Sequence, residues 1–190
     1  VLARLHLVRH GEVLNPDHLV YSDLPGFGLS EQGRREAQAV ADHLGGREID
    51  VIAVSPLQRA AETAAPLAAA LGLDPETDDR LTEWGLLRRW AGIVWEDLAG
   101  RFPGEVEAYL THPEDLPFSP EPLDAVAARV RAAVADLGAR HPGGTAVIVS
   151  HQDPVQAARL ALTGRPLGDL PDDKPAHGTV LTLEPGDPWS

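Results

Sequence analysis

Short continuous runs of apolar residues alternate along the chain with longer segments in which apolar residues recur at helical spacing. The runs at residues 4–9, 51–54 and 146–149 are typical of strands that are covered on both faces. Residues 178–184 have a composition that predicts a last strand. Each run is separated from the next by enough chain to form at least one helix, so the pattern indicates strands joined by helical crossovers.

The spacing of apolar residues predicts four helices, over residues 30–44, 55–71, 123–137 and 153–163. Ser30 is the expected N-cap of the first helix. Ser55 and Pro56 are the expected N-cap and first residue of the second. Residues 78–121 are rich in Trp, Gly, Pro and charged residues, and we expect short helices there, over one end of the sheet.

Alternation of strands and helices predicts an α/β fold, a three-layer α/β/α sandwich with a mostly parallel sheet. The sequence has no internal repeat, low-complexity tract or long linker. We therefore expect residues 1–190 to form a single domain. A chain of 190 residues with 43% hydrophobic residues is large enough to bury a sizeable core.

The composition excludes several kinds of function. A formal net charge of -13 disfavours nucleic acid and anionic membranes as partners. No apolar run approaches the ~18 residues of a membrane span, and the first residues lack the pattern of a signal peptide, so a cytoplasmic location is expected. The chain has no cysteine, which excludes thiolate metal sites and cysteine nucleophiles. Lys174 is the sole lysine and therefore the one candidate for lysine chemistry.

Polar side chains follow directly after three of the predicted strands: Arg9-His10, Ser55 and Ser150-His151. In an open α/β sheet, ligands bind at the carboxyl ends of the strands, so His10 and His151 are expected to meet there. The helix that begins after Ser55 offers its N-terminal N–H groups to an anion at the same edge, and Arg59 lies in its first turn. Arginine suits such a site because its guanidinium donates two bonds to two oxygens. The pattern predicts a phosphate pocket.

Three motifs occur in this order: RHGE at residues 9–12, SPLQRAAETA at 55–64 and VSHQ at 149–152. Together they resemble the histidine phosphatase superfamily, whose members have the phosphoglycerate mutase-like fold. The resemblance covers about residues 4–185. RHG alone is a weak signal, whereas the three motifs in this order and at these spacings are a specific one.

The resemblance implies a catalytic role for each matched residue. His10 would be the nucleophile and would form a phosphohistidine, while Arg9 and Arg59 would hold phosphoryl oxygens. His151 would be a second imidazole, in its cationic form, that stabilises the transferring group. These roles agree with the demands of phosphoryl transfer, which needs in-line attack and neutralised charge and little other chemistry. A neutral imidazole is nucleophilic near neutral pH.

The proton donor of the family is an acid in an L-x-E-like context, and RLTEWG matches it at Glu83. To donate a proton Glu83 must be protonated, so we expect partial burial to raise its pKa. Three other acids could serve instead, namely Glu12, Asp79 and Glu96. Asn15 resembles an asparagine that often touches the phosphate, although an asparagine before proline is also typical of a turn.

Three positions differ from the family pattern. Ser22 stands where many members have a glycine whose backbone approaches the phosphate, and Asp23 follows it. Asp23 would repel a phosphate dianion if its carboxylate pointed inward. Gln152 replaces a glycine that is common after the second histidine.

The sequence favours a phosphatase that hydrolyses a small phosphomonoester through a phosphohistidine, with no metal and no cofactor. Metal-binding patterns such as H-E-x-x-H and the EF-hand loop do not occur. The first alternative is a cofactor-dependent phosphoglycerate mutase, which the short 78–121 segment disfavours because a mutase must exclude water. The second is a non-catalytic domain that binds a phosphorylated ligand. A homodimer is compatible with all three functions.

Overall fold

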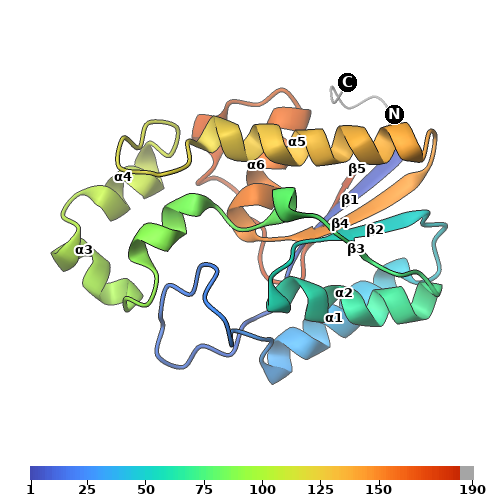
Figure 1. Ribbon diagram of the computed structural model, residues 1–190, viewed down its shortest axis with the longest axis horizontal. Helices are drawn as coiled ribbons and strands as arrows, with labels where there is room; N and C mark the ends of the chain where they lie inside the picture. Colours follow the sequence, from blue (N-terminus) through green and yellow to red (C-terminus); the bar gives the residue numbers. More distant parts are fainter. Residues whose placement is uncertain (185–190) are drawn as a thin grey trace.

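The computed structural model describes residues 1–184, in which a central sheet lies between two layers of helices (Figure 1). The strands are β1 (Arg4–Arg9), β2 (Val51–Val54), β3 (Glu76–Thr77), β4 (Thr145–Ser150) and β5 (Val180–Leu183). They are arranged in the order β3-β2-β4-β1-β5. β5 is antiparallel to β1, and the other pairs are parallel. The predicted α/β fold with a mostly parallel sheet is confirmed.

The α-helices are α1 (Glu31–Leu44), α2 (Gln58–Leu71), α3 (Leu98–Arg101), α4 (Glu105–Thr111), α5 (Leu123–Arg140) and α6 (Gln152–Leu162). Short 3₁₀ helices are η1 (Asp79–Leu81), η2 (Gly85–Trp90), η3 (Trp95–Asp97) and η4 (Leu167–Asp169). Helices α1 and α2 cover one face of the sheet, and α5 and α6 cover the other (Figure 1). None of the helices within residues 1–184 has the length and apolar character needed to cross a bilayer.

Both faces of the sheet are buried, which explains the continuous apolar runs in the sequence. Leu7 and Ile148 pack in one apolar cluster with residues of α5 and α6. Val8 and Val149, one position further along their strands, pack in another with residues of α1 and α2. Successive side chains of a strand point to opposite faces, so a strand covered on both sides needs apolar residues at every position.

The predicted start of α1 is confirmed, whereas that of α2 is wrong. The Ser30 hydroxyl accepts a hydrogen bond from the backbone N–H three residues on and caps α1. Helix α2 begins at Gln58, with Leu57 as its N-cap, so Ser55 and Pro56 precede the helix. The Ser55 hydroxyl accepts from the N–H of Leu57, before the helix begins, and also contacts a histidine at the sheet edge.

The 78–121 segment holds short helices beside the carboxyl end of the sheet, as predicted (Figure 1). Its large aromatic residues Trp84, Trp90 and Tyr109 are buried together. They pack against the ends of α5 and α6, including Leu123 and Leu160. This second core fixes the segment as a wall next to the strand ends. The two-residue strand β3 was not predicted, because both of its residues are exposed and give no apolar run.

Candidate active site

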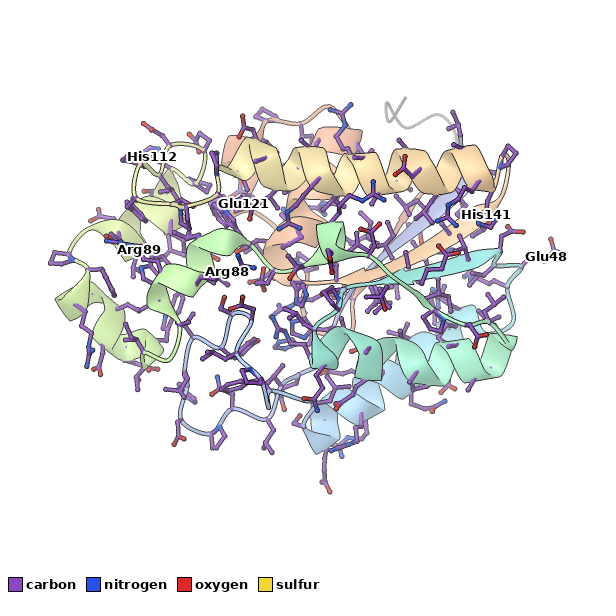
Figure 2. The ribbon with its side chains drawn as sticks, in the orientation of Figure 1. Glu48, Arg88, Arg89, His112, Glu121 and His141 are labelled. Carbon is purple, nitrogen blue, oxygen red and sulfur yellow. The ribbon has the colours of Figure 1, made fainter. Side chains whose placement is uncertain are left out.

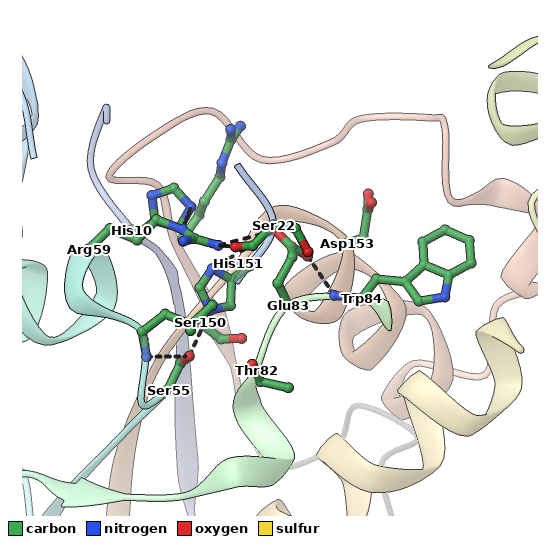
Figure 3. Close-up of polar contacts among 12 residues, drawn as sticks. His10, Ser22, Ser55, Arg59, Thr82, Glu83, Trp84, Ser150, His151 and Asp153 are labelled. Carbon is green, nitrogen blue, oxygen red and sulfur yellow. Dashed lines mark hydrogen bonds and ion pairs between the residues drawn. The ribbon is translucent and has the colours of Figure 1, made fainter. Parts of the chain in front are cut away.

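The structure brings His10 and His151 together at the carboxyl end of the sheet (Figure 3). The ring centroids are 5.2 Å apart, and both side chains are buried. Strands β1 and β4 are parallel neighbours, and the His10 N–H donates to the Ser150 carbonyl over 2.9 Å. Two residues far apart in the chain therefore meet because their strands end side by side.

His10 is held as a neutral imidazole whose two nitrogens have different partners. Its Nδ1 lies 2.7 Å from the Gly11 carbonyl, to which it can only donate, so the ring proton is on Nδ1 and the lone pair is on Nε2. Burial and the nearby Arg59 guanidinium lower the pKa of His10 well below its ordinary value. Arg59 Nε donates a hydrogen bond to His10 Nε2 over 3.3 Å, so a cation adjoins this nitrogen.

Arg59 is fixed by contacts on all sides. Its guanidinium donates to the Ser22 carbonyl over 2.7 Å and lies 4.7 Å from the centre of the Tyr21 ring. One turn further along α2, the Thr63 hydroxyl donates to the Arg59 carbonyl over 2.7 Å and accepts from the Gly11 N–H at 3.0 Å. This threonine ties α2 to the segment after β1, so the arginine and the nucleophile keep a constant separation.

Arg9 is held by the last part of the described chain. Its guanidinium donates to the Pro175 carbonyl and to His177 Nε2, each over 2.8 Å. Burial and the Arg9 charge lower the pKa of His177, which keeps that ring neutral and able to accept. His177 belongs to none of the sequence motifs, and its contact with Arg9 places it beside the site.

His151 presents one unpaired N–H to the site. The Ser55 hydroxyl accepts from the Leu57 N–H at 3.3 Å and lies 2.7 Å from His151 Nε2; with the hydroxyl as donor in this contact, the ring proton is on Nδ1. His151 Nδ1 is buried without a partner among the described residues. Burial and Arg59 lower the pKa of His151 well below its ordinary value. The lowered pKa favours the neutral ring in this arrangement, because burial and a neighbouring arginine disfavour a further positive charge. The expected cationic form of His151 during catalysis stays a prediction.

Glu83 is positioned through its backbone. Arg129 of α5 donates to the carbonyls of Arg80, Thr82 and Glu83 over 2.6, 2.8 and 3.1 Å. One carboxylate oxygen of Glu83 accepts from the Trp84 N–H at 2.8 Å. The chain around Glu83 is thus fixed by a helix on the opposite side, and its second oxygen faces the two histidines (Figure 3).

The second oxygen of Glu83 lies 3.9 Å from His151 Nδ1 and 4.0 Å from an Arg59 nitrogen. Burial raises the pKa of Glu83 to about 7, and the nearby Asp153 carboxylate adds to this rise, whereas Arg59 opposes it. The expected raised pKa is thus present. A carboxyl group that titrates near neutral pH can donate a proton and later accept one.

The alternative acids lie in less suitable places. The Glu12 carboxylate accepts from the Ser30 hydroxyl at 2.6 Å, on the side of α1. Glu96 pairs with His18 over 3.1 Å, and both side chains are largely exposed. Asp79 is exposed in η1. The geometry favours Glu83.

The loop between β1 and α1 carries Asn15, Ser22 and Asp23. Both amide atoms of Asn15 bond the backbone of Leu19, over 2.9 and 3.0 Å, as in a turn. Asn15 also lines the cavity described below, but its phosphate-binding role stays a prediction. Ser22 is buried with a φ of 42°, a conformation that favours glycine. Asp23 pairs with Arg88 over 2.7 Å, so its charge is compensated there.

A cavity of about 370 Å³ opens in front of these groups. Its wall is formed by Arg9, His10, Asn15, His18, Leu19, Val20, Tyr21, Ser22, Glu83, Leu87, Trp95, Glu96, Tyr109, Gln152 and Asp153. Gln152, which stands where many members have glycine, also reaches the Pro175 carbonyl over 3.4 Å. The wall of the cavity thus combines Arg9, His10 and Glu83 with Leu87, Trp95 and Tyr109 of the 78–121 segment.

The comparison with known protein families agrees with this geometry. The family model of the histidine phosphatase superfamily (branch 1) matches residues 5–188. The chain belongs to this superfamily. The prediction of an enzyme of the histidine phosphatase type is confirmed by this membership.

Three relatives of this histidine phosphatase illustrate the relationship. An uncharacterized protein of Mycobacterium tuberculosis is 45% identical, over 86% of this chain and 80% of its own length. Phosphoserine phosphatase 1 of Hydrogenobacter thermophilus is 34% identical, over 86% of this chain and 77% of its own. The mycobacterial glucosyl-3-phosphoglycerate phosphatase, solved as a complex with VO3, superposes with a TM-score of 0.86. It is 31% identical, and the match covers 96% of this chain and 92% of that one.

The site of this histidine phosphatase includes a charged group that the motifs do not reveal. Asp153, at the start of α6, is buried and accepts from the Tyr109 hydroxyl at 2.9 Å and from Lys174 Nζ at 2.8 Å. Lys174 Nζ also lies 4.3 Å from the centre of the Tyr109 ring. The one available signal was that Lys174 is the sole lysine in the sequence. Among residues 1–184, no three His, Cys, Asp or Glu side chains are grouped so as to hold a metal ion.

Proposed function

We propose that this histidine phosphatase is a metal-independent phosphomonoesterase that hydrolyses a small phosphorylated substrate through a phosphohistidine on His10. The observation that carries the proposal is the state of His10: a buried neutral imidazole whose Nε2 lone pair is fixed by the Nδ1 bond to Gly11. A nucleophile needs an available lone pair and a constant direction of attack, and both are supported here.

The charge around His10 also supports phosphoryl transfer. Arg9 and Arg59 would bind the phosphoryl oxygens, and the unpaired N–H of His151 would donate to a third. The transition state spreads negative charge over these oxygens, so fixed cations and donors stabilise it. Both guanidiniums are already held by protein carbonyls and rings, so little reorganisation is needed when the substrate binds.

The proposed reaction has two steps, with Glu83 moving the proton in each. His10 Nε2 attacks phosphorus, the P–N bond forms and the P–O bond to the alcohol breaks. Glu83 in its protonated form gives its proton to the leaving alkoxide. A water molecule then attacks phosphorus, and Glu83, now a carboxylate, accepts a proton from it. The P–N bond breaks, inorganic phosphate leaves, and His10 is again neutral.

The relatives support hydrolysis rather than transfer between substrates. Two of the similar proteins are named phosphoserine phosphatase and glucosyl-3-phosphoglycerate phosphatase. The latter has been solved with inorganic phosphate, which is the product of the proposed reaction. No feature of the described site specifically favours a phosphoglycerate mutase.

Chelation tests the proposal directly. The purified protein should release inorganic phosphate from p-nitrophenyl phosphate at the same rate with and without EDTA, because the two arginines supply the positive charge. Phosphate release is measured by colorimetry. As a check for mutase activity, 3-phosphoglycerate with its bisphosphate cofactor should give no isomerised product. Recovery of a chelated protein by Mg²⁺ or Zn²⁺ alone would contradict the metal-independent mechanism.

The pH dependence should reflect the pKa of Glu83. Glu83 must be protonated in the first step, and its pKa is raised to about 7. We therefore expect kcat/KM for an alkyl phosphate to be high below this pH and to fall as the pH rises through it. His10 must be neutral, and its pKa is lowered well below the ordinary value, so it should not limit activity near pH 6.

Asp153→Asn should move this alkaline limb to lower pH by about one unit, because a neighbouring negative charge that favours the protonated form of Glu83 is removed. Complete pH profiles of kcat/KM with one substrate compare the variants, since titration of the substrate then cancels. Asp172→Asn, which removes an exposed charge on the nearby loop, is the matched control. An unchanged limb in Asp153→Asn would show that Asp153 does not control the proton on Glu83.

A further inference from the structure

We propose that the substrate is the monophosphate of an alcohol or phenol whose remaining body is uncharged and largely apolar. The inference rests on the proposed phosphatase function and concerns the part of the cavity that does not hold the phosphate. It predicts selectivity against substrates that carry a carboxylate or a second phosphate.

The cavity has two chemically different ends. Arg9, His10, Ser22 and Glu83 form the end where the phosphoryl group would react. Most of the remaining wall is apolar or aromatic, from Leu19, Val20, Tyr21, Leu87, Trp95 and Tyr109. A volume of about 370 Å³ is at the small end of the range for ligand sites, so the leaving group is a small molecule.

The cations near the far end are already paired. Lys174 Nζ lies 2.8 Å from an Asp153 oxygen, and its side chain is only 15% exposed. Burial of both partners makes this pair costly to separate, because each would be left as an unpaired charge in a poorly solvated place. Lys174 is therefore not available to bind a second anion of the substrate.

The charged side chains at the rim of the cavity, the end away from the phosphate site, are also paired. His18, which also lines the cavity, faces Glu96 over 3.1 Å. Arg88, which is next in the chain to a lining residue, forms a salt bridge with Asp23 over 2.7 Å. Figure 2 shows Arg88 and Arg89 in the segment beside the sheet. A carboxylate entering this end would meet the acids Asp153 and Glu96, whereas Arg9, a lining cation without an acidic partner, lies at the end that would hold the phosphate.

These observations have a common consequence for binding. An apolar group gains free energy when it leaves water for the wall, whereas an anion would lose its hydration without gaining a partner. An amine would be tolerated better than an anion, but the apolar lining favours an uncharged body. Selectivity against anionic substrates therefore depends on the lack of a cationic partner for them as much as on favourable contacts with apolar groups.

Phenyl phosphate and 4-carboxyphenyl phosphate form a matched pair of probes, because both release a phenol and differ in one remote carboxylate. For the wild-type protein, we expect kcat/KM for phenyl phosphate to be higher by at least about tenfold. Equal or reversed values would overturn the inference while leaving the phosphatase function intact. Hydrolysis of neither substrate would overturn the proposed function and the inference with it.

A charge change in the wall provides the second test. Asp153→Asn releases Lys174 from its partner, so the preference for phenyl phosphate over the carboxylated analogue should fall severalfold. In the double variant Asp153→Asn with Lys174→Met, the cation is absent and the preference should return. Because the test compares the ratio of kcat/KM for the two substrates, an effect of the substitutions on Glu83 that is common to both substrates cancels. A preference that stays the same in all three proteins would contradict the assigned role of the Asp153–Lys174 pair.

The apolar part of the inference is tested with two alkyl substrates. Butyl phosphate should have a higher kcat/KM than glycerol phosphate, by about tenfold, because its leaving group fits the apolar wall. Trp95→Ala should reduce this preference, mainly through KM. Leu110→Ala, which changes an exposed apolar residue outside the cavity, is the matched control. A wild-type preference for glycerol phosphate would show that the body of the substrate is polar.

Discussion

His10→Ala should reduce turnover to less than about one per cent of the wild-type rate, because loss of a covalent nucleophile costs several orders of magnitude. No other imidazole can take its place: His10 lines the cavity, whereas His151 Nε2 contacts Ser55 and His177 Nε2 accepts from Arg9. The loss is measured with p-nitrophenyl phosphate under saturating conditions.

Trapping of the intermediate makes this test specific for the nucleophile. With phosphate-labelled substrate and a rapid quench, the wild-type protein should carry label that is stable to base and labile to acid, as expected for phosphohistidine. His10→Ala should carry none. His43→Ala changes an exposed histidine of α1 and serves as the control for folding and handling. A labelled His10→Ala protein, or one that retains several per cent of activity, would exclude His10 as the nucleophile.

Glu83→Gln should slow the hydrolysis of alkyl phosphates by about 10²–10⁴-fold, because their leaving alkoxide needs a proton. The effect on p-nitrophenyl phosphate should be much smaller, since its leaving group departs with a stable negative charge. Glutamine keeps the size of the side chain and can still accept from the Trp84 N–H, so the local fold is maintained. Single-turnover formation of the phosphoenzyme is the measurement, because it isolates the first step for both substrates.

The outcomes of this comparison separate three roles. A large contrast between the two substrates identifies Glu83 as the proton donor. Equal slowing of both would mean that Glu83 orients the pocket, consistent with its place between Arg59 and His151. If neither substrate is slowed, another acid donates the proton. Glu96→Gln is the control variant for all three outcomes, since Glu96 is an acid that lines the cavity at the rim.

Sequence patterns predicted the parts of the site that depend on strand ends. Buried parallel strands give continuous apolar runs, and the residues that follow them meet at one edge of the sheet. His10 and His151 could therefore be placed together before the structure was considered. Arg59 could be placed with them because it lies near the start of a helix that leaves the same edge.

The rest of the site depends on contacts that no local pattern records. Asp153 accepts hydrogen bonds from Tyr109 and Lys174, which are 44 and 21 residues away in the chain. Irregular loops connect these segments and bring the side chains together. Arg9 meets His177 across 168 residues for the same reason. The start of α2 was also misplaced: Ser55 is a favourable N-cap by composition, but its hydroxyl accepts from the Leu57 N–H and contacts His151, and the helix begins at Gln58.

The dependence of Arg9 on the far end of the chain has a consequence for biosynthesis. Residues of β1 are translated long before Pro175, His177 and the pairing strand β5. Strands β1, β2, β3 and β4 can associate before then, because their pairing needs no later residue. Arg9 obtains its two acceptors only when that later stretch emerges. A nascent chain thus carries His10 and Arg9 long before Arg9 is held in place, and we expect the proposed activity to begin only after this stretch has been translated.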